Sequence, residues 1–132
     1  MKRIIGLLII VLPFCIVACT KADTGEDSTV EQTEYYVKYA SEGLSSTYNV
    51  SYTDETGKKQ SFSDISGETF ERIIGPVAVG YEATFRIWVS NTNDTKTRAA
   101  RIEVKKGNSP FVVKVEKSGK GYSGVSVSYT IE

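Results

Sequence analysis

Residues 47–53 read Thr-Tyr-Asn-Val-Ser-Tyr-Thr and alternate strictly between small polar and apolar side chains. Successive side chains of a β-strand point to opposite faces, so this alternation predicts a strand with one apolar and one polar face. The same period of two recurs in segments 35–39, 83–89, 100–104, 111–115 and 125–131, and weaker strand signals lie at Phe62 and in segment 70–74. No segment after residue 19 carries a sustained helical stripe, so the sequence predicts an all-β domain.

Turn-forming residues separate these segments where hairpins need them. They are Asp54-Glu55-Thr56-Gly57, Asn91-Thr92-Asn93-Asp94, Gly107-Asn108 and Ser118-Gly119-Lys120-Gly121. Strands with one apolar and one polar face favour two sheets packed against each other rather than a barrel. We therefore expect an immunoglobulin-like antiparallel β-sandwich of seven to eight strands, with the strand order left open.

The composition narrows the function classes. The chain has 132 residues, a formal net charge of zero and no histidine. Its length corresponds to one domain, and its charge balance lacks the basic footprint of a nucleic-acid binder. The absence of histidine excludes Ser-His-Asp catalysis and histidine-ligated metals. The acidic pairs Asp54/Glu55 and Glu26/Asp27 fall in a predicted turn and a polar segment, so we expect no enzyme, no cofactor and no metal site.

The N-terminal sequence predicts an export signal. Lys2 and Arg3 precede an apolar segment at residues 4–17. Fourteen helical residues span about 21 Å, which is short of a hydrocarbon core of about 30 Å and favours a cleaved signal over a transmembrane helix. Ile16-Val17-Ala18-Cys19 resembles a bacterial lipobox, which implies cleavage between Ala18 and Cys19 and lipidation of Cys19. An ordinary secretory signal with an incidental cysteine is the alternative.

This assignment divides the chain into a signal peptide (1–18), a flexible tether from lipidated Cys19 (19–33) and a β-sandwich domain (34–132). The tether is polar and too poor in apolar residues to fold, and as a coil it would average about 20 Å. Cys15 is removed and Cys19 carries the lipid, so the mature protein keeps no free thiol. Thr20 after the cysteine favours an outer-membrane location, on either its periplasmic or its cell-surface face. The expected partners are the membrane, through the lipid, and an envelope protein or glycan.

A family resemblance appears in the strand residues. Residues 48–54, Tyr-Asn-Val-Ser-Tyr-Thr-Asp, then Glu55-Thr56-Gly57, and later Phe-Arg-Ile-Trp-Val at 85–89 and Arg-Ile-Glu-Val at 101–104, resemble the membrane-anchored accessory proteins of mycobacterial lipid transporters. The resemblance implies a compact β-sandwich and, as an alternative function, an accessory subunit of an envelope lipid or export transporter. The chain lacks the two cysteines usual in those domains, and the resemblance assigns no functional residue.

Trp88 is the candidate ligand-binding residue. It alternates with the apolar row Ala83, Phe85, Ile87 and Val89, so it points to the polar face together with Arg86. An exposed tryptophan on a sheet can stack on a sugar ring or anchor a protein partner. Alternatively, a loop covers it, or it forms a cation–π contact with Arg86 or Arg101.

Lysines gather near the C-terminal hairpins, at positions 105, 106, 114, 117 and 120. Edge strands often carry lysine, which prevents pairing with another sheet. This interpretation needs no ligand. A surface for anionic lipid is the alternative.

Overall fold

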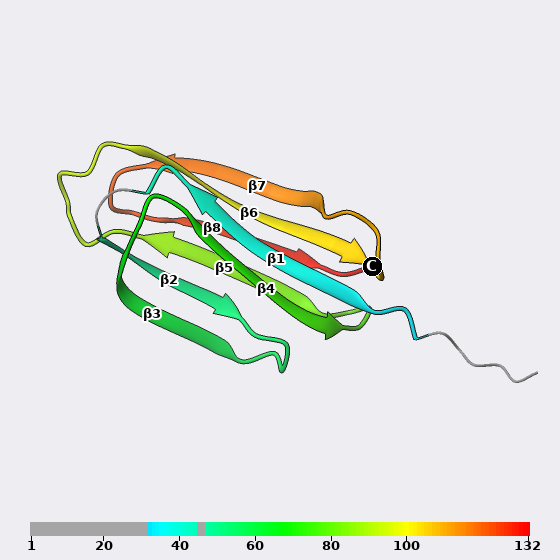
Figure 1. Cartoon of the computed structure of the whole chain (residues 1–132). Coiled ribbons are helices and arrows are strands. Elements are labelled where there is room, and N and C mark those ends of the chain that lie inside the picture. Colours follow the sequence, from blue (N-terminus) through cyan, green and yellow to red (C-terminus); the bar gives the residue numbers. More distant parts are fainter. Residues whose placement is uncertain (1–31, 45–46) are drawn as a thin grey trace, which may run out of the picture. The chain divides into compact units, whose positions relative to one another are not determined.

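The computed structural model describes residues 32–44 and 47–132, which form eight β-strands and no helix (Figure 1). The strands are β1 (Tyr35–Glu42), β2 (Thr47–Thr53), β3 (Lys59–Ser66), β4 (Phe70–Val77), β5 (Glu82–Trp88), β6 (Thr97–Lys106), β7 (Val112–Lys120) and β8 (Val125–Thr130). They make two antiparallel four-stranded sheets, in the orders β4-β1-β6-β7 and β3-β2-β5-β8. The prediction of an all-β, antiparallel sandwich is confirmed. The predicted signal peptide, Cys19 and nearly all of the tether lie outside the described residues.

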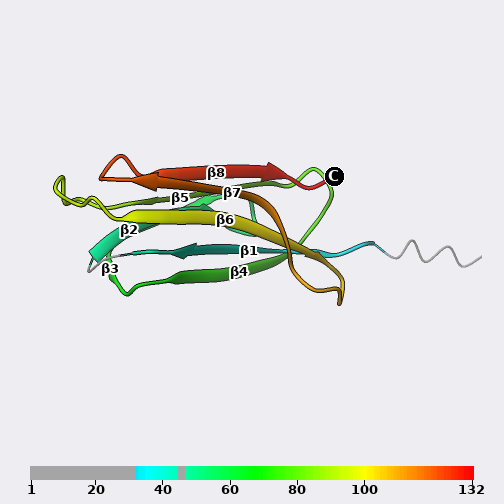
Figure 2. The ribbon, with the colours of Figure 1, turned by 90° about the horizontal axis from the view of Figure 1, so that it is seen from above.

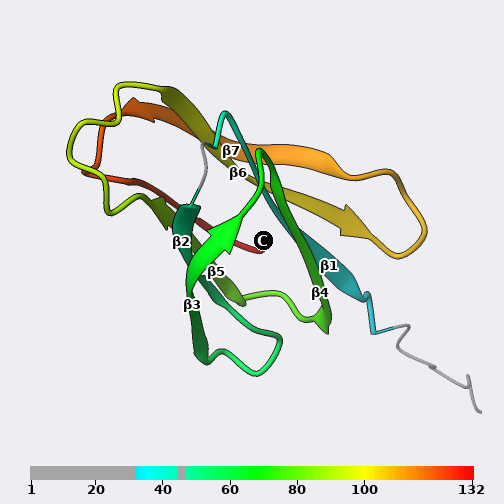
Figure 3. The ribbon, with the colours of Figure 1, turned by 60° about the vertical axis from the view of Figure 1, so that its left-hand side comes forward.

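The two sheets lie face to face in two layers (Figure 3). Only the connections β2–β3 and β6–β7 join neighbours within one sheet, and the other five connections cross between the sheets. Strands β3 and β4 are the free edges on one side of the sandwich (Figure 3). Phe62 on β3 is 46% exposed there, and its ring stacks on Tyr52 at a centroid distance of 6.0 Å.

The core is built from the inward residues of both sheets. Tyr39, Phe85 and Ile102 are each no more than 1% exposed. The Phe85 ring lies 5.4 Å from that of Tyr39 and 5.7 Å from that of Phe70. Five of the six predicted alternating rows supply this core, which explains why a period of two gave the right architecture.

The sixth row, at 111–115, was predicted to face the core, and this prediction is wrong for Val113, which is 51% exposed. Strand β7 is a sheet edge, and Phe111 precedes it. Ile102 pairs with Val115 but Glu103 pairs with Val113, so a β-bulge interrupts the alternation at this point. An edge strand with a bulge covers little of the core, which leaves its valines exposed.

The turn predicted at Ser118–Gly121 is also misplaced. Strand β7 continues through Gly119 to Lys120, and the reversal occurs at residues 121–124. Gly119 pairs with Arg98, and a Cβ atom at position 119 would lie 3.0 Å from Val125 Cγ2. Glycine is therefore used here for a close approach to β8, whereas Gly121 and Gly124 supply the positive φ angles of the turn.

The turn after β2 is organised by the Asp54 carboxylate. Oδ1 accepts hydrogen bonds from the backbone N–H and the hydroxyl of Thr56 and from the Lys58 N–H, and Oδ2 accepts one from Gln60. The hydroxyl of Thr56 contributes most to lowering the pKa of Asp54 to about 2, with further contributions from Gln60 and the backbone donors. The predicted turn is thus present, with its aspartate held in the charged form.

Asp54→Asn should therefore make the melting temperature depend less on pH in the acid range. The pKa of Asp54 rises from about 2 to its ordinary value of 3.8 on unfolding, so its contribution to stability is complete above pH 4 and is lost as the pH falls toward 2. Melting temperatures of both proteins, measured in steps from pH 6 to pH 2, should differ most above pH 4 and converge near pH 2. Parallel curves over this range would contradict the assignment.

Candidate functional site

Trp88 lies at the end of β5 on the outer face of the β3-β2-β5-β8 sheet. Its apolar neighbours in sequence, Ile87 and Val89, are buried, whereas Trp88 is half-buried and Arg86 is exposed. The guanidinium carbon of Arg86 lies 5.2 Å from the centroid of the Trp88 ring system. Trp88 and Arg86 thus form the cation–π contact that the sequence offered as the alternative to an open ligand face, and Arg101 belongs to the other sheet.

Asn49 is the cross-strand partner of Trp88. Its side chain is held at both ends, because Nδ2 donates to Ser90 Oγ at 3.1 Å and Oδ1 accepts from the Asp64 N–H at 3.1 Å. Asn49 is only 6% exposed, so its amide is fixed beside the tryptophan.

Asp64 reaches this position through a bulge in β3. Val50 pairs with Phe62 but Tyr48 pairs with Ile65, so two residues of β3 oppose Asn49 alone. Asp64 has a φ angle of 56°, a left-handed conformation that is uncommon outside glycine. Bulges and strained residues of this kind often re-aim a side chain next to a functional site.

A polar hollow of about 340 Å³ lies at this end of the sandwich. It is lined by Thr47, Tyr48, Asn49, Asp64, Ser90, Asn91 and Asp94. Arg86, Trp88 and Ser90 are spaced two residues apart, so their side chains point to the same face of the sheet. Ser90 lines the hollow, so the cation–π pair lies next to it in this row. An aromatic surface beside amide, hydroxyl and carboxylate groups suits a neutral, hydroxylated ligand.

Sequence reasoning missed Asn49, Asp64 and Ser90 as members of this site. The sequence does indicate the bulge in β3 weakly. Phe62 and Ile65 are both apolar but lie three residues apart, which breaks the period of two. The register shows that the bulge restores the inward direction of Ile65, which packs against the core. The bulge is therefore detectable in sequence, but the hollow that it helps to form is not.

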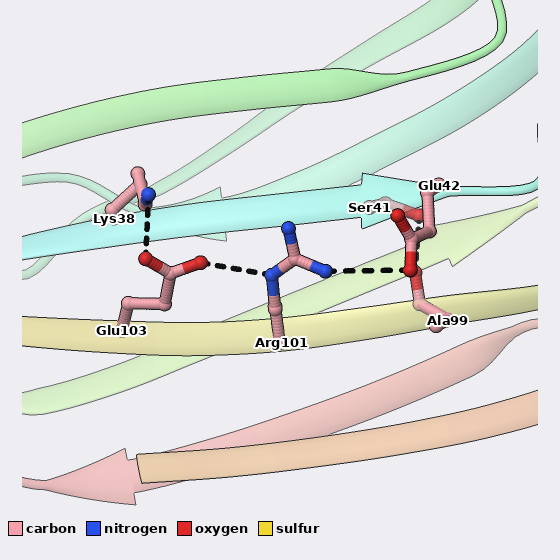
Figure 4. Close-up of polar contacts among 6 residues, drawn as sticks. All are labelled: Lys38, Ser41, Glu42, Ala99, Arg101 and Glu103. Atoms are coloured by element: carbon pink, nitrogen blue, oxygen red, sulfur yellow. Dashed lines mark hydrogen bonds and ion pairs between the residues drawn. The ribbon is translucent and has the colours of Figure 1, made fainter. Parts of the chain in front are cut away.

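A ladder of charged side chains crosses the outer face of the other sheet (Figure 4). Lys38 Nζ lies 2.5 Å from Glu103 Oε2, and Arg101 Nε lies 2.8 Å from Glu103 Oε1. Arg101 Nη1 reaches Glu42 Oε1 at 3.4 Å. Burial raises the pKa of Glu103, but the hydrogen bonds from Lys38 and Arg101 outweigh it and hold that pKa below its ordinary value. Both oxygens of Glu103 are thus occupied, which fits a cross-strand clamp rather than a proton-transfer group.

The other acidic candidates have similar structural roles. Asp54 is occupied by its own turn, as described above. In the turn at 91–94, Asn91 Oδ1 accepts from the Asn93 N–H, and Asp94 Oδ1 accepts from the Lys96 N–H, each at 2.9 Å. Within residues 32–44 and 47–132, no three His, Cys, Asp or Glu side chains gather in a way that could hold a metal ion. Glu26 and Asp27 lie outside these ranges.

The five lysines divide into two groups. Lys114, Lys117 and Lys120 lie on β7, at a free edge of the β4-β1-β6-β7 sheet. Lys105 and Lys106 instead end β6, and Lys105 Nζ lies 4.9 Å from the Tyr36 ring centroid and 5.3 Å from that of Phe111. Protection of a sheet edge thus accounts for the positions of the first group only.

Comparison with known proteins adds no assignment. No protein-family model matches this chain, and no curated protein matches it. In the described part of the chain, no helix is long and apolar enough to cross a bilayer.

Proposed function

We propose that this protein is a lipid-anchored, non-enzymatic lipoprotein of the bacterial cell envelope that presents the Trp88 face of its β-sandwich to a glycan. The observation that carries the proposal is the half-buried Trp88, held by Arg86 and placed beside the polar hollow of Asn49 and Ser90. Sugar rings have an apolar face that stacks on an aromatic ring and hydroxyl groups that bond to such polar groups.

Trp88 lies at the end of the domain that is far from where the chain enters, which supports the proposal. Residues 32–34 enter the domain at the start of β1, and β5 begins at that same end of the sandwich and runs away from it (Figure 1). The six residue-to-residue steps from Glu82 to Trp88 cover about 20 Å of strand. A domain tethered through Cys19 would thus carry Trp88 at the end away from its point of attachment.

Trp88→Ala should weaken glycan binding and leave the fold largely intact. Loss of an aromatic hot spot of about 2 kcal/mol weakens affinity by about thirtyfold. Trp88 is the chain's single tryptophan, so its fluorescence reports binding directly in a titration with purified envelope polysaccharides and peptidoglycan fragments. Binding by the variants can be followed by calorimetry.

Phe62→Ala is the matched control, because Phe62 is an exposed aromatic residue on β3 that lies outside the proposed site. It should bind as the unaltered protein does. A large fall in melting temperature for Trp88→Ala would instead make Trp88 a core residue. Crosslinking in intact cells that recovers a transporter, with no glycan bound in the titrations, would favour the accessory-subunit function.

A further inference from the structure

The end of the domain where the chain enters carries exposed aliphatic and basic side chains. Residues 32–34 border hollows shared with Pro76, Val77 and Ala78 and with Lys106 and Gly107. The Gly107 N–H also donates to the Glu34 carbonyl at 2.8 Å. Thus the entering chain, the β4–β5 turn and the β6–β7 turn lie together at one end of the sandwich (Figure 2). We call this the anchor-side end, comprising residues 32–36, 76–81 and 105–114.

Two valines of this end are unusually open to solvent. Val79, in the β4–β5 turn, is 63% exposed, and Val112, at the start of β7, is 55% exposed. Exposed aliphatic residues that gather at one end of a domain often mark a contact with a partner or a membrane.

Lysines lie beside one of these valines, Val112. Lys106 and Lys114 are exposed, and they line one hollow together with Val112 and Glu132. Lys105 lies over the rings of Tyr36 and Phe111. Glu34 and Glu132 line hollows of this region, and Glu34 accepts a hydrogen bond from Tyr36. Glu82, at the start of β5, and Asp54 and Glu55, in the β2–β3 turn, are further carboxylates at the same end of the sandwich. Lysine beside aromatic and aliphatic side chains is the combination that proteins place at the headgroup level of a bilayer.

We propose that the anchor-side end rests on anionic lipid headgroups, with Val79 and Val112 toward the membrane and Lys106 and Lys114 toward lipid phosphates. The inference rests on the proposed lipid anchor at Cys19. The thirteen residues 19–31 can reach at most about 45 Å, so the anchor keeps this end at a high local concentration near the bilayer. Contacts that are too weak to recruit a free protein are then sufficient to orient a tethered one.

Acetylation of the lysines of β6 and β7 tests the inference. The native lipoprotein is inserted into vesicles of phosphatidylcholine alone or mixed with phosphatidylglycerol, and acetylation rates are read for each lysine by peptide mass spectrometry. Anionic vesicles should slow Lys106 and Lys114 by about fivefold, which is the preference of one lysine for an anionic surface. Lys117 and Lys120, toward the other end of β7, should keep their rates, and high salt should restore the first two.

A second measurement reports the polarity of the surroundings of Val79. Val79→Cys, labelled with an environment-sensitive dye, should report a less polar surrounding on anionic vesicles. The double variant Lys106→Gln/Lys114→Gln should lose this signal, and the matched Lys117→Gln/Lys120→Gln should keep it. Equal acetylation of all four lysines, or a signal lost equally in both double variants, would overturn the inference while leaving the anchor in place. A native protein that does not enter the vesicle fraction would overturn the anchor, and this inference with it.

Discussion

Asp94→Ala is expected to lower the free energy of unfolding by about 3–5 kcal/mol, because it leaves a buried arginine without its countercharge. Arg98 is only 1% exposed, and its Nη2 lies 2.8 Å from Asp94 Oδ2. Arg98 Nη1 also donates to the Gly121 carbonyl, so this side chain joins the β5–β6 loop to the β7–β8 turn. Chemical denaturation of the two proteins would measure the difference.

A second substitution separates the ion pair from the loop. The double variant Asp94→Ala/Arg98→Met removes both charges and fills the space with an apolar side chain, so it should recover much of the lost stability. If the double variant is as unstable as Asp94→Ala, the cost lies in the loop turn rather than in the uncompensated charge. A loss below about 1 kcal/mol for Asp94→Ala would contradict the role of the pair.

Phe85→Ala should have a comparable effect, with a loss of about 3–5 kcal/mol. The Phe85 ring is 1% exposed and packs against Tyr39 on β1 and Phe70 on β4, so it joins the two sheets at their centre. Its truncation leaves a cavity that the surrounding strands cannot close. Denaturation midpoints would give the size of the loss.

Phe62→Ala provides the control, since it makes the same chemical change at a side chain that is 46% exposed on an edge strand. The loss there should be well under half of that at Phe85. Equal losses at both positions would mean that the sandwich is not held together by burial between its sheets.

The fold could be read from the sequence because alternation reports which face of a strand is buried. It succeeded for central strands such as β5, where Phe85 and Ile87 face the core and Arg86 does not. It failed on β7, where Val113 is apolar but lies at a sheet edge beside a bulge. Apolar character alone does not show whether another layer covers a strand, because that depends on strand order.

The candidate site was only partly accessible to the same reasoning. The outward direction of Trp88 and its contact with Arg86 follow from their spacing of two residues on one strand. The hollow beside them depends on β2, β3 and the loop after β5, which come together only in the folded sheet. Asn49 looked like a solvent-facing residue of a half-buried strand, but its place in the central strand β2, between β3 and β5, leaves it buried.

The anchor at Cys19 is the claim on which the proposed function most depends, and the mass of the native N-terminus tests it most directly. Protein purified from membranes of the source cells should begin at Cys19, and its first peptide should carry a diacylglyceryl group on the sulfur. A mature chain with an unmodified Cys19 thiol, or one that still carries residues 1–18, would contradict the account.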